Sequence, residues 1–240
     1  MGYPDAKNNE AVGPNPPCPA CFDMTAVTIV GGHGKVALLL AKELTAKGFQ
    51  VKSLFRNSDH KADVAKTGAD TQVFDIESAN VDDIASQFKG ADAIVFSAGA
   101  GGGNPSRTYA IDRDAAIRTM KAAEQANVKR YVMVSYLGAG PNHGVPKDNG
   151  FYAYAEAKAA ADTFLRSTNL DWTILMPGML SLEEPTGKIE YNPQKDKRTA
   201  VSRANVALVA AAVLQAPNTV HKEIPFLDGD EKIADVISRI

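Results

Sequence analysis

A tyrosine and a lysine on one predicted helix form the most reactive pair of side chains in the sequence. Tyr154 and Lys158 stand four positions apart in the segment YAYAEAK, so a helix places them on the same face. An ammonium group beside a phenol stabilises the phenolate and lowers the phenol pKa, which makes tyrosine an effective acid or base near neutral pH. The alternative is a structural role in an alanine-rich amphipathic helix, with Lys158 solvated. Tyr152 is a rival tyrosine, but its spacing from Lys158 turns it elsewhere.

A glycine-rich segment near the start of the chain has the residue types that hold a phosphate group. The segment GGHGKVA, residues 31–37, follows the β-branched run AVTIV, residues 26–30, and precedes an apolar pattern with helical spacing. Gly31 permits a sharp reversal of the chain, and Gly34 lets the backbone approach a diphosphate without a Cβ in the way. Free N–H groups at the start of the helix then meet the anion. An ordinary tight turn is the alternative, and the flanking strand and helix patterns favour the nucleotide site.

The residue that selects the nucleotide stands at the end of the second predicted strand, Gln50–Phe55. An acidic residue there would bind the ribose hydroxyls of NAD, whereas this chain has Arg56, followed by Asn57. A guanidinium can bind a 2′-phosphate through two parallel hydrogen bonds. His33 and Lys35 in the glycine turn add positive character. We therefore expect NADP(H) as the cofactor, with NAD(H) as the second choice, and a solvated surface role for Arg56 as the alternative.

The composition is that of an ordinary globular protein. The chain has 240 residues, of which 45% are hydrophobic and 22% charged, and its net charge is −2. This length can bury one sizeable core. No basic patch favours nucleic acid, and no apolar run is long enough to span a membrane. The expected partner is a small-molecule substrate and the expected location is the cytoplasm, and the composition leaves the assembly open between a monomer and a homodimer.

Residues 1–24 differ from the rest of the chain because they are rich in proline and lack periodicity. We expect an irregular N-terminal extension here. Cys18 and Cys21 have the C-x-x-C spacing of a dithiol site or of half a metal site. No further cysteine completes a metal site, and the neighbouring prolines argue against the helix N-terminus that lowers a thiol pKa. We expect incidental thiols and no metal.

Strand and helix patterns alternate regularly from residue 25 to residue 240. The predicted strands are Ala26–Val30, Gln50–Phe55, Thr71–Phe74, Ala93–Ala98, Tyr131–Tyr136, Trp172–Met176 and Glu223–Leu227. The predicted helices follow Gly34 and span Ser58–Lys66, Val81–Phe88, Thr108–Ala126, Tyr152–Arg166 and Ser202–Gln215, with a last short helix near the end. This alternation predicts one α/β domain of the Rossmann type, a doubly wound parallel sheet in a three-layer αβα arrangement. Ligands of such sheets bind beyond the carboxyl ends of the strands.

Several of these segments together resemble one known family. The turn GGHGKVA, the strand end FRNS, the segment DAIVFSAGAGG, the run VKRYVMVSYLGA, the helix YAYAEAK and the segment DWTILMPGMLS are similar to an atypical short-chain dehydrogenase/reductase. The chain resembles the NmrA-like, NAD(P)H-binding subgroup in particular, and also flavin reductases and nucleotide-sugar epimerases. The resemblance covers about residues 25–240 and implies a substrate-side segment at about residues 178–203.

The resemblance also implies roles for individual residues. Tyr154 would give or take the proton, Lys158 would bind the nicotinamide ribose, and Ser135 would be the third catalytic residue. The cofactor would lie along Gly31, Gly32, His33, Gly34, Lys35, Val36, Arg56, Asn57, Asp75, Ile76, Ser97, Ala98, Gly99, Lys158 and Pro177.

Two departures from the family pattern bear on the reaction. Enzymes of the broader family end the strand before the active-site helix in two small hydroxyl residues, whereas here Tyr136 and Leu137 follow Ser135. Met176 stands where relatives often carry an arginine. The first hypothesis is an NADPH-dependent oxidoreductase that transfers hydride to a small carbonyl, quinone or flavin-like acceptor. The alternatives are an NmrA-like redox sensor that binds NADP(H) without catalysis and a nucleotide-sugar epimerase or dehydratase.

Overall fold

The computed structural model describes residues 25–194 and 200–240 as alternating strands and helices. The expected extension at residues 1–24, with Cys18 and Cys21, lies outside these ranges. The strands are β1 (Ala26–Val30), β2 (Gln50–Phe55), β3 (Asp70–Val73), β4 (Ala93–Phe96), β5 (Arg130–Val134), β6 (Asp171–Pro177), β7 (Met179–Ser181), β8 (Lys188–Tyr191), β9 (Ala200–Ser202), β10 (Lys222–Asp228) and β11 (Glu231–Lys232). The α-helices are α1 (Lys35–Ala46), α2 (Lys61–Ala65), α3 (Val81–Phe88), α4 (Pro105–Thr108), α5 (Ala116–Gln125), α6 (Tyr152–Arg166), α7 (Arg203–Leu214) and α8 (Ile233–Ser238).

Within the described residues, one nine-stranded sheet has the order β11-β8-β10-β6-β5-β4-β1-β2-β3. Its strands from β3 to β10 pair in parallel, which confirms the expected doubly wound α/β fold. β8 and β11 add an antiparallel edge that the sequence analysis does not predict. The chain runs outward from β1 to β3 and then returns to β4 on the other side of β1. This reversal creates the switch point at which ligands of doubly wound sheets bind.

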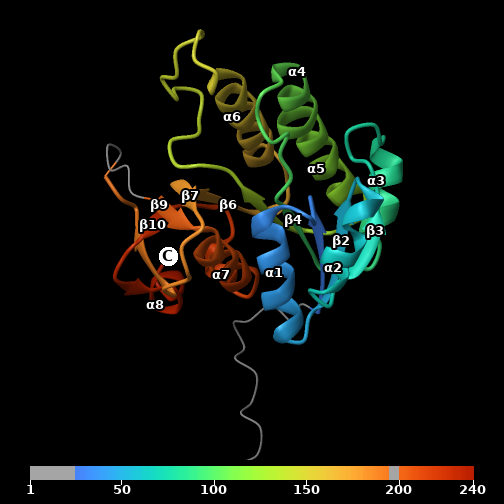
Figure 1. Ribbon diagram of the computed structural model, residues 1–240, viewed down its shortest axis with the longest axis horizontal. Helices are drawn as coiled ribbons and strands as arrows, with labels where there is room; N and C mark the ends of the chain where they lie inside the picture. Colours follow the sequence, from blue (N-terminus) through green and yellow to red (C-terminus); the bar gives the residue numbers. More distant parts are fainter. Residues whose placement is uncertain (1–24, 195–199) are drawn as a thin grey trace, which may run out of the picture.

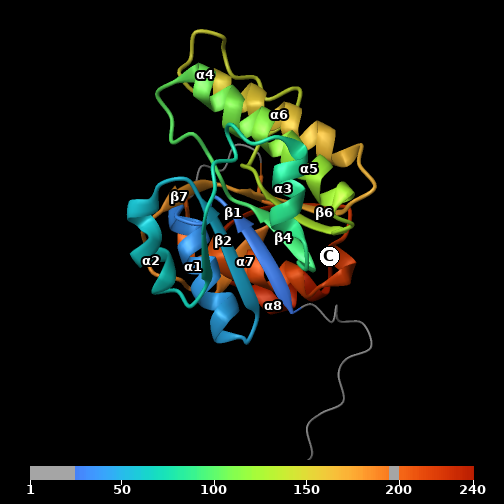
Figure 2. The ribbon, with the colours of Figure 1, turned by 90° about the vertical axis from the view of Figure 1, so that its right-hand side faces the viewer.

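Helices cover both faces of the sheet, as Figures 1 and 2 show from two directions. Helices α1, α7 and α8 pack on one face, where Leu40, Val209 and Val236 are among the fully buried core residues. Helices α3, α5 and α6 pack on the other face, around Phe88 and Met120. In the described part of the chain, no helix is long and apolar enough to cross a membrane. The helices on both faces bury the sheet, so the ends of its strands are the part left to form a site.

The helix expected at Thr108–Ala126 is longer and is interrupted. It consists of α4, a π-helical segment at Tyr109–Ala115, and α5. The segment expected on the substrate side, at about residues 178–203, contains β7, β8 and β9. β7 and β9 pair in parallel to form a small second sheet. Both irregular regions lie close to the strand ends that form the candidate site, because the π-helical segment contacts α6 and β7 continues directly from β6.

Candidate functional site

A cavity of about 280 Å³ lies beyond the carboxyl ends of β1, β2, β3 and β4. Each of these strands contributes the residues that immediately follow its last paired residue, so the cavity occupies the switch point of the sheet. The cavity is lined by Gly31, His33, Gly34, Leu54, Phe55, Arg56, Asn57, His60, Phe74, Asp75, Ile76, Glu77, Ser97, Ala98, Gly99, Arg107 and Ile111.

The glycine turn brings bare backbone to the floor of this cavity. Gly31 has a φ of +85°, and a Cβ at this position would lie 2.5 Å from the Cα of Ala98. A Cβ on Gly34 would lie 3.2 Å from the carbonyl oxygen of Gly31 and 3.4 Å from that of Ser97. Gly31 therefore needs glycine for the turn and for its close approach to the end of β4, and Gly34 keeps a small cradle beside these two carbonyl oxygens free of a Cβ.

Helix α1 begins directly at this cradle without a side-chain cap. Its N-cap is Gly34, no side chain accepts a hydrogen bond there, and its first turn holds no acidic residue. The first N–H groups of a helix have no acceptor within the helix, and the helix dipole adds positive potential at this end. A diphosphate fits these features because it supplies both the acceptors and the negative charge.

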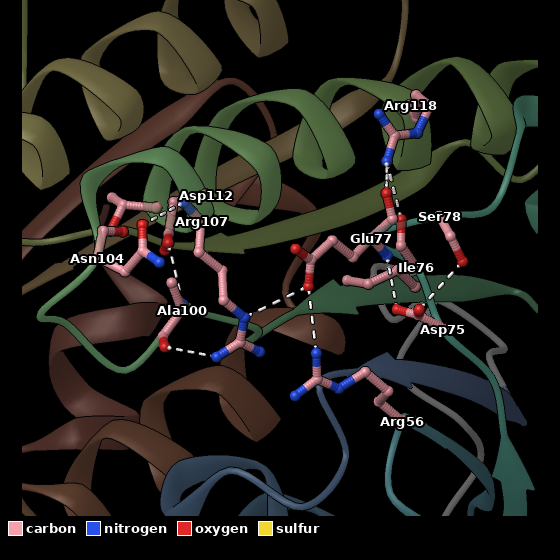
Figure 3. A network of polar contacts seen from close by, with 11 residues as sticks. Arg56, Asp75, Ile76, Glu77, Ser78, Ala100, Asn104, Arg107, Asp112 and Arg118 are labelled. Atoms are coloured by element: carbon pink, nitrogen blue, oxygen red, sulfur yellow. Dashed lines mark hydrogen bonds and ion pairs between the residues drawn. The ribbon is translucent and has the colours of Figure 1, made fainter.

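The far side of the cavity carries two arginines that share one carboxylate, as Figure 3 shows. Nη1 of Arg56 and Nε of Arg107 each lie 3.3 Å from Oε2 of Glu77. Arg107 also donates from Nη1 to the carbonyl oxygen of Ala100, at 3.2 Å, in the glycine-rich loop after β4. This wall therefore contains the guanidinium expected at the end of β2, together with a partner acid and a second arginine that the sequence analysis did not identify.

Asp75 is occupied mainly by its own loop. Its carboxylate accepts hydrogen bonds from the N–H of Glu77 and from Oγ of Ser78, each at 3.0 Å. Nη2 of Arg118 donates to the carbonyl oxygens of Ile76 and Glu77, each at 2.9 Å, and fixes the same loop from α5. The loop after β3 is therefore held in place before any nucleotide contacts it (Figure 3).

Tyr154 and Lys158 lie on one face of α6, but their relation differs from the expected one. The buried Nζ of Lys158 donates to the carbonyl oxygen of Val134 at 2.9 Å and lies 5.8 Å from the ring centre of Phe96. Burial, with Asp112 as the next contribution, raises the pKa of Tyr154. The pKa of Tyr154 is therefore shifted in the direction opposite to the one expected, because desolvation of the phenol dominates.

Ser135 is buried, and its hydroxyl is hydrogen-bonded inside the protein. Its Oγ donates to Oδ2 of the fully buried Asp162, one helical turn beyond Lys158 on α6. Burial raises the pKa of Asp162 and lowers that of Lys158, each opposed by the charge of the other. The hydroxyl of Ser135 thus satisfies a buried carboxyl group.

Aromatic side chains surround Tyr154 on the outer side. The ring of Tyr136 lies 5.5 Å from that of Tyr154, and the ring of Phe151 lies 5.1 Å from it. The hydroxyl of Tyr136 is buried and has no hydrogen-bond partner among the described residues. An acceptor with a planar or apolar body could pack against this group of rings.

Asp112 connects the cavity with this second region. It is buried in the π-helical segment, and its Oδ2 accepts from the N–H of Ala100 at 3.0 Å. A Cβ on Gly99, which lines the cavity, would lie 3.3 Å from its Oδ1. Burial raises the pKa of Asp112, and the charges of Lys158 and Arg107 oppose that shift. The cavity and the α6 residues therefore form adjoining parts of one site.

The expected cofactor residues divide into two groups. Most of them line the cavity, namely Gly31, His33, Gly34, Arg56, Asn57, Asp75, Ile76, Ser97, Ala98 and Gly99. The others, Gly32, Lys35, Val36, Lys158 and Pro177, do not line it. A Cβ on Gly32 would lie 2.5 Å from the Cβ of Ser53, so Gly32 serves packing against β2. Pro177 pairs in the sheet with Phe226, and its carbonyl oxygen accepts from the N–H of Leu137.

The cavity also contains ionisable residues that sequence reasoning missed. These are His60, Glu77 and Arg107. The ring of His60 stacks on that of His33, with a centroid distance of 3.5 Å and an interplanar angle of 14°. Glu77 could have been suspected from its place just after a strand end, whereas Arg107 reaches the cavity from α4 and gives no local signal.

Comparisons with known proteins agree with this geometry. Residues 31–217 match a family described as NAD(P)H-binding. The UPF0659 protein YMR090W of Saccharomyces cerevisiae is 35% identical over an alignment of 222 positions that covers 89% of this chain and 98% of the relative. A solved structure from Bacillus halodurans, provisionally described as an NAD-dependent epimerase/dehydratase, is 34% identical, with a TM-score of 0.83 over 90% of this chain and 100% of that one. The oxidoreductase ylbE from Lactococcus lactis is 28% identical, with a TM-score of 0.80 over 90% and 96%.

Proposed function

Because the chain belongs to the NAD(P)H-binding family, we propose that it is an NADPH-dependent oxidoreductase that transfers hydride to a small carbonyl, quinone or flavin-like acceptor. One observation carries this proposal. The uncapped start of α1 and the guanidinium of Arg56 face a single cavity at the switch point of the sheet. A nucleotide with a diphosphate and a 2′-phosphate satisfies both groups at once.

The residues of the cavity divide the binding of such a nucleotide between them. The first turn of α1 would hold the diphosphate over Gly34, and Arg56 would hold the 2′-phosphate. The bare backbone of Gly99 would allow the rest of the nucleotide to pass toward α6. When bound, the reduced nicotinamide supplies a hydride. The protein must then supply the proton that the acceptor oxygen needs.

Tyr154 is the residue we assign to that proton. The phenol of Tyr154 is protonated at neutral pH, so it carries the proton that a reduction needs, and an ammonium group on Lys158 would stabilise the phenolate left behind against the raised pKa that burial causes. As the acceptor carbon receives the hydride, the O–H bond of Tyr154 would break and its proton would pass to the acceptor oxygen. Lys158 would hold a positive charge close by, since its Nζ is fixed on the carbonyl oxygen of Val134.

Loss of the phenol hydroxyl tests this assignment. Oxidation of NADPH, followed by its absorbance, is measured with a panel of aldehydes and quinones. We expect Tyr154→Phe to lower turnover by about 10²- to 10⁴-fold, the usual contribution of a positioned acid. Tyr152→Phe is the matched control, because it removes the same hydroxyl from the same helix at a position that faces His143. Turnover that survives in Tyr154→Phe would contradict the role of this residue.

A redox sensor of the NmrA-like kind is the second candidate. Two features favour it: Tyr136 and Leu137 stand where the broader family has its second small hydroxyl residue, and the hydroxyl of Ser135 is committed to Asp162. Tight NADPH binding without turnover on any acceptor would favour the sensor over the oxidoreductase. Flavin acceptors are left out of the decisive comparison, since hydride can pass to them without a protein acid.

A further inference from the structure

We propose that Glu77 determines the specificity of the cavity for the adenosine end of the cofactor. Its carboxylate is a built-in counter-ion of Arg56 and Arg107, and it opposes the entry of a 2′-phosphate. The strength of the preference for NADPH over NADH is therefore set by the pair Arg56 and Glu77, rather than by Arg56 alone. This inference rests on the proposed function for the identity of the nucleotide.

Three separate segments bring these side chains together. Arg56 follows β2, Glu77 lies in the loop after β3, and Arg107 comes from α4, yet all three line the same cavity (Figure 3). Oε2 of Glu77 lies 3.3 Å from Nη1 of Arg56 and 3.3 Å from Nε of Arg107. A single carboxylate oxygen thus lies between two guanidinium groups that could otherwise bind an anion.

The backbone of Glu77 is held by hydrogen bonds on both sides of the residue. The N–H of Glu77 donates to Asp75, and its carbonyl oxygen accepts from Arg118 at 2.9 Å. The side chain of Glu77 is 29% exposed, so its charge is only partly screened by water. The loop is therefore held so that Glu77 stays at the cavity, and its carboxylate can move only by rotation of the side chain.

A bound 2′-phosphate would meet this arrangement as a competitor. To bind Arg56 through two hydrogen bonds, the phosphate must replace Glu77 and accept a like charge close to it. The ribose of NADH carries no charge at this position, so Glu77 does not repel it. A carboxylate can even accept hydrogen bonds from ribose hydroxyls. Glu77 should consequently weaken NADPH binding much more than NADH binding.

The test is a measurement of dissociation constants by calorimetry for NADPH and NADH. We expect Glu77→Gln to tighten NADPH binding about tenfold, which corresponds to about 1.4 kcal/mol, and to leave NADH within about twofold. Glu43→Gln is the matched control, because Glu43 is also 29% exposed and is paired with Lys47, at 3.0 Å, on α1. Adenosine 2′,5′-bisphosphate and adenosine 5′-monophosphate should show the same contrast, since they carry only the adenosine end.

Each other outcome overturns the inference in a recognisable way. An equal change for both dinucleotides, or the same change in Glu43→Gln, would mean that only overall charge matters. Weaker NADPH binding in Glu77→Gln would mean that Glu77 positions Arg56 for the phosphate. If neither dinucleotide binds the wild-type protein, the proposed function fails together with this inference. Should Glu77→Gln fold poorly by circular dichroism, Glu77→Ala removes the same charge and is expected to change the ratio in the same direction.

Discussion

The nucleotide cavity and the region around Tyr154 are built on different principles. In the cavity, exposed backbone would do most of the binding, because Gly31 and Gly34 precede the uncapped start of α1. The region around Tyr154 is formed by side chains from distant segments. There, Ser135 and Lys158 make their hydrogen bonds to the protein itself. A site made of backbone follows from local sequence, whereas a site made of side chains depends on how each strand and helix is rotated.

This difference predicts unequal responses to substitution. Changes in the glycine turn should damage folding and nucleotide binding together, because the same atoms pack against β4 and line the cavity. A substitution around Tyr154 should mainly lower either the stability or the turnover, because the buried contacts and the reacting hydroxyl belong to different residues. The three substitutions that follow test this contrast, beginning with the largest expected effect.

Gly31→Ala should be the most damaging single change. The new Cβ would lie 2.5 Å from the Cα of Ala98, and alanine would also have to adopt a φ of +85°. Backbone strain and overpacking together should lower the free energy of unfolding by about 3 kcal/mol or more. Gly90→Ala is the control, because Gly90 has a φ of +79° with nothing within 4 Å of a Cβ, and it should lose only about 1–2 kcal/mol. Equal losses in urea unfolding would show that the contact with Ala98 is unimportant.

Ser135→Ala should affect stability more than chemistry. The substitution removes the donor to the buried Asp162, which should lower the free energy of unfolding by about 1.5–3 kcal/mol, since the acceptor belongs to an ionisable group. Turnover with NADPH should remain close to that of the wild type. Ser86→Ala is the control, because Ser86 is an exposed serine on α3 and should change the stability by less than about 0.5 kcal/mol. A fall in turnover comparable with that of Tyr154→Phe would instead place Ser135 in the chemistry.

Tyr136→Phe should give the smallest effect at neutral pH, with a dependence on alkaline pH. Burial raises the pKa of Tyr136 from 10.0 to about 12, with smaller contributions from Asp162 and Glu156. Above pH 10 the unfolded phenol ionises while the folded one stays protonated, so this group costs the wild type stability between pH 10 and 12. The Tyr136→Phe protein does not lose stability in this way. The substitution also removes a buried hydroxyl that has no partner among the described residues.

The free energy of unfolding, measured from pH 7 to pH 11, checks this prediction. Tyr136→Phe should be equal to the wild type or slightly more stable at pH 7, and its advantage should grow above pH 10. A difference that is constant with pH would mean that Tyr136 ionises equally in the folded and unfolded states.

The parts of the fold that depend on short stretches of chain were predictable. β1, the glycine turn and α1 follow from a buried run, a turn signal and a helical period, and their observed bounds are close to the expected ones. The antiparallel edge was not predictable in this way. β8 is a four-residue strand that pairs with β10, more than thirty residues later in the chain, and nothing within KIEY specifies that partner.

The candidate site shows the same division. The glycines and Arg56 were identified because they follow strand ends, and parallel strands bring their carboxyl ends to one edge. The inward orientation of Ser135 depends on where β5 ends, since one residue of shift along a strand turns a side chain to the opposite face. Glu77 could have been suspected from its place near a strand end, but its pairing with two arginines could not be foreseen, because Arg56 follows β2 and Arg107 comes from α4.

The π-helical turn at Tyr109–Ala115 accommodates one more residue than an α-helical turn of the same height. Removing a single residue from this stretch would allow α4 and α5 to merge into one regular helix without breaking the chain's path. Asp112 would then rotate about the helix axis and release the N–H of Ala100. The number of residues in this π-helical segment, as well as their identity, therefore holds the glycine-rich loop after β4 in place beside the cavity.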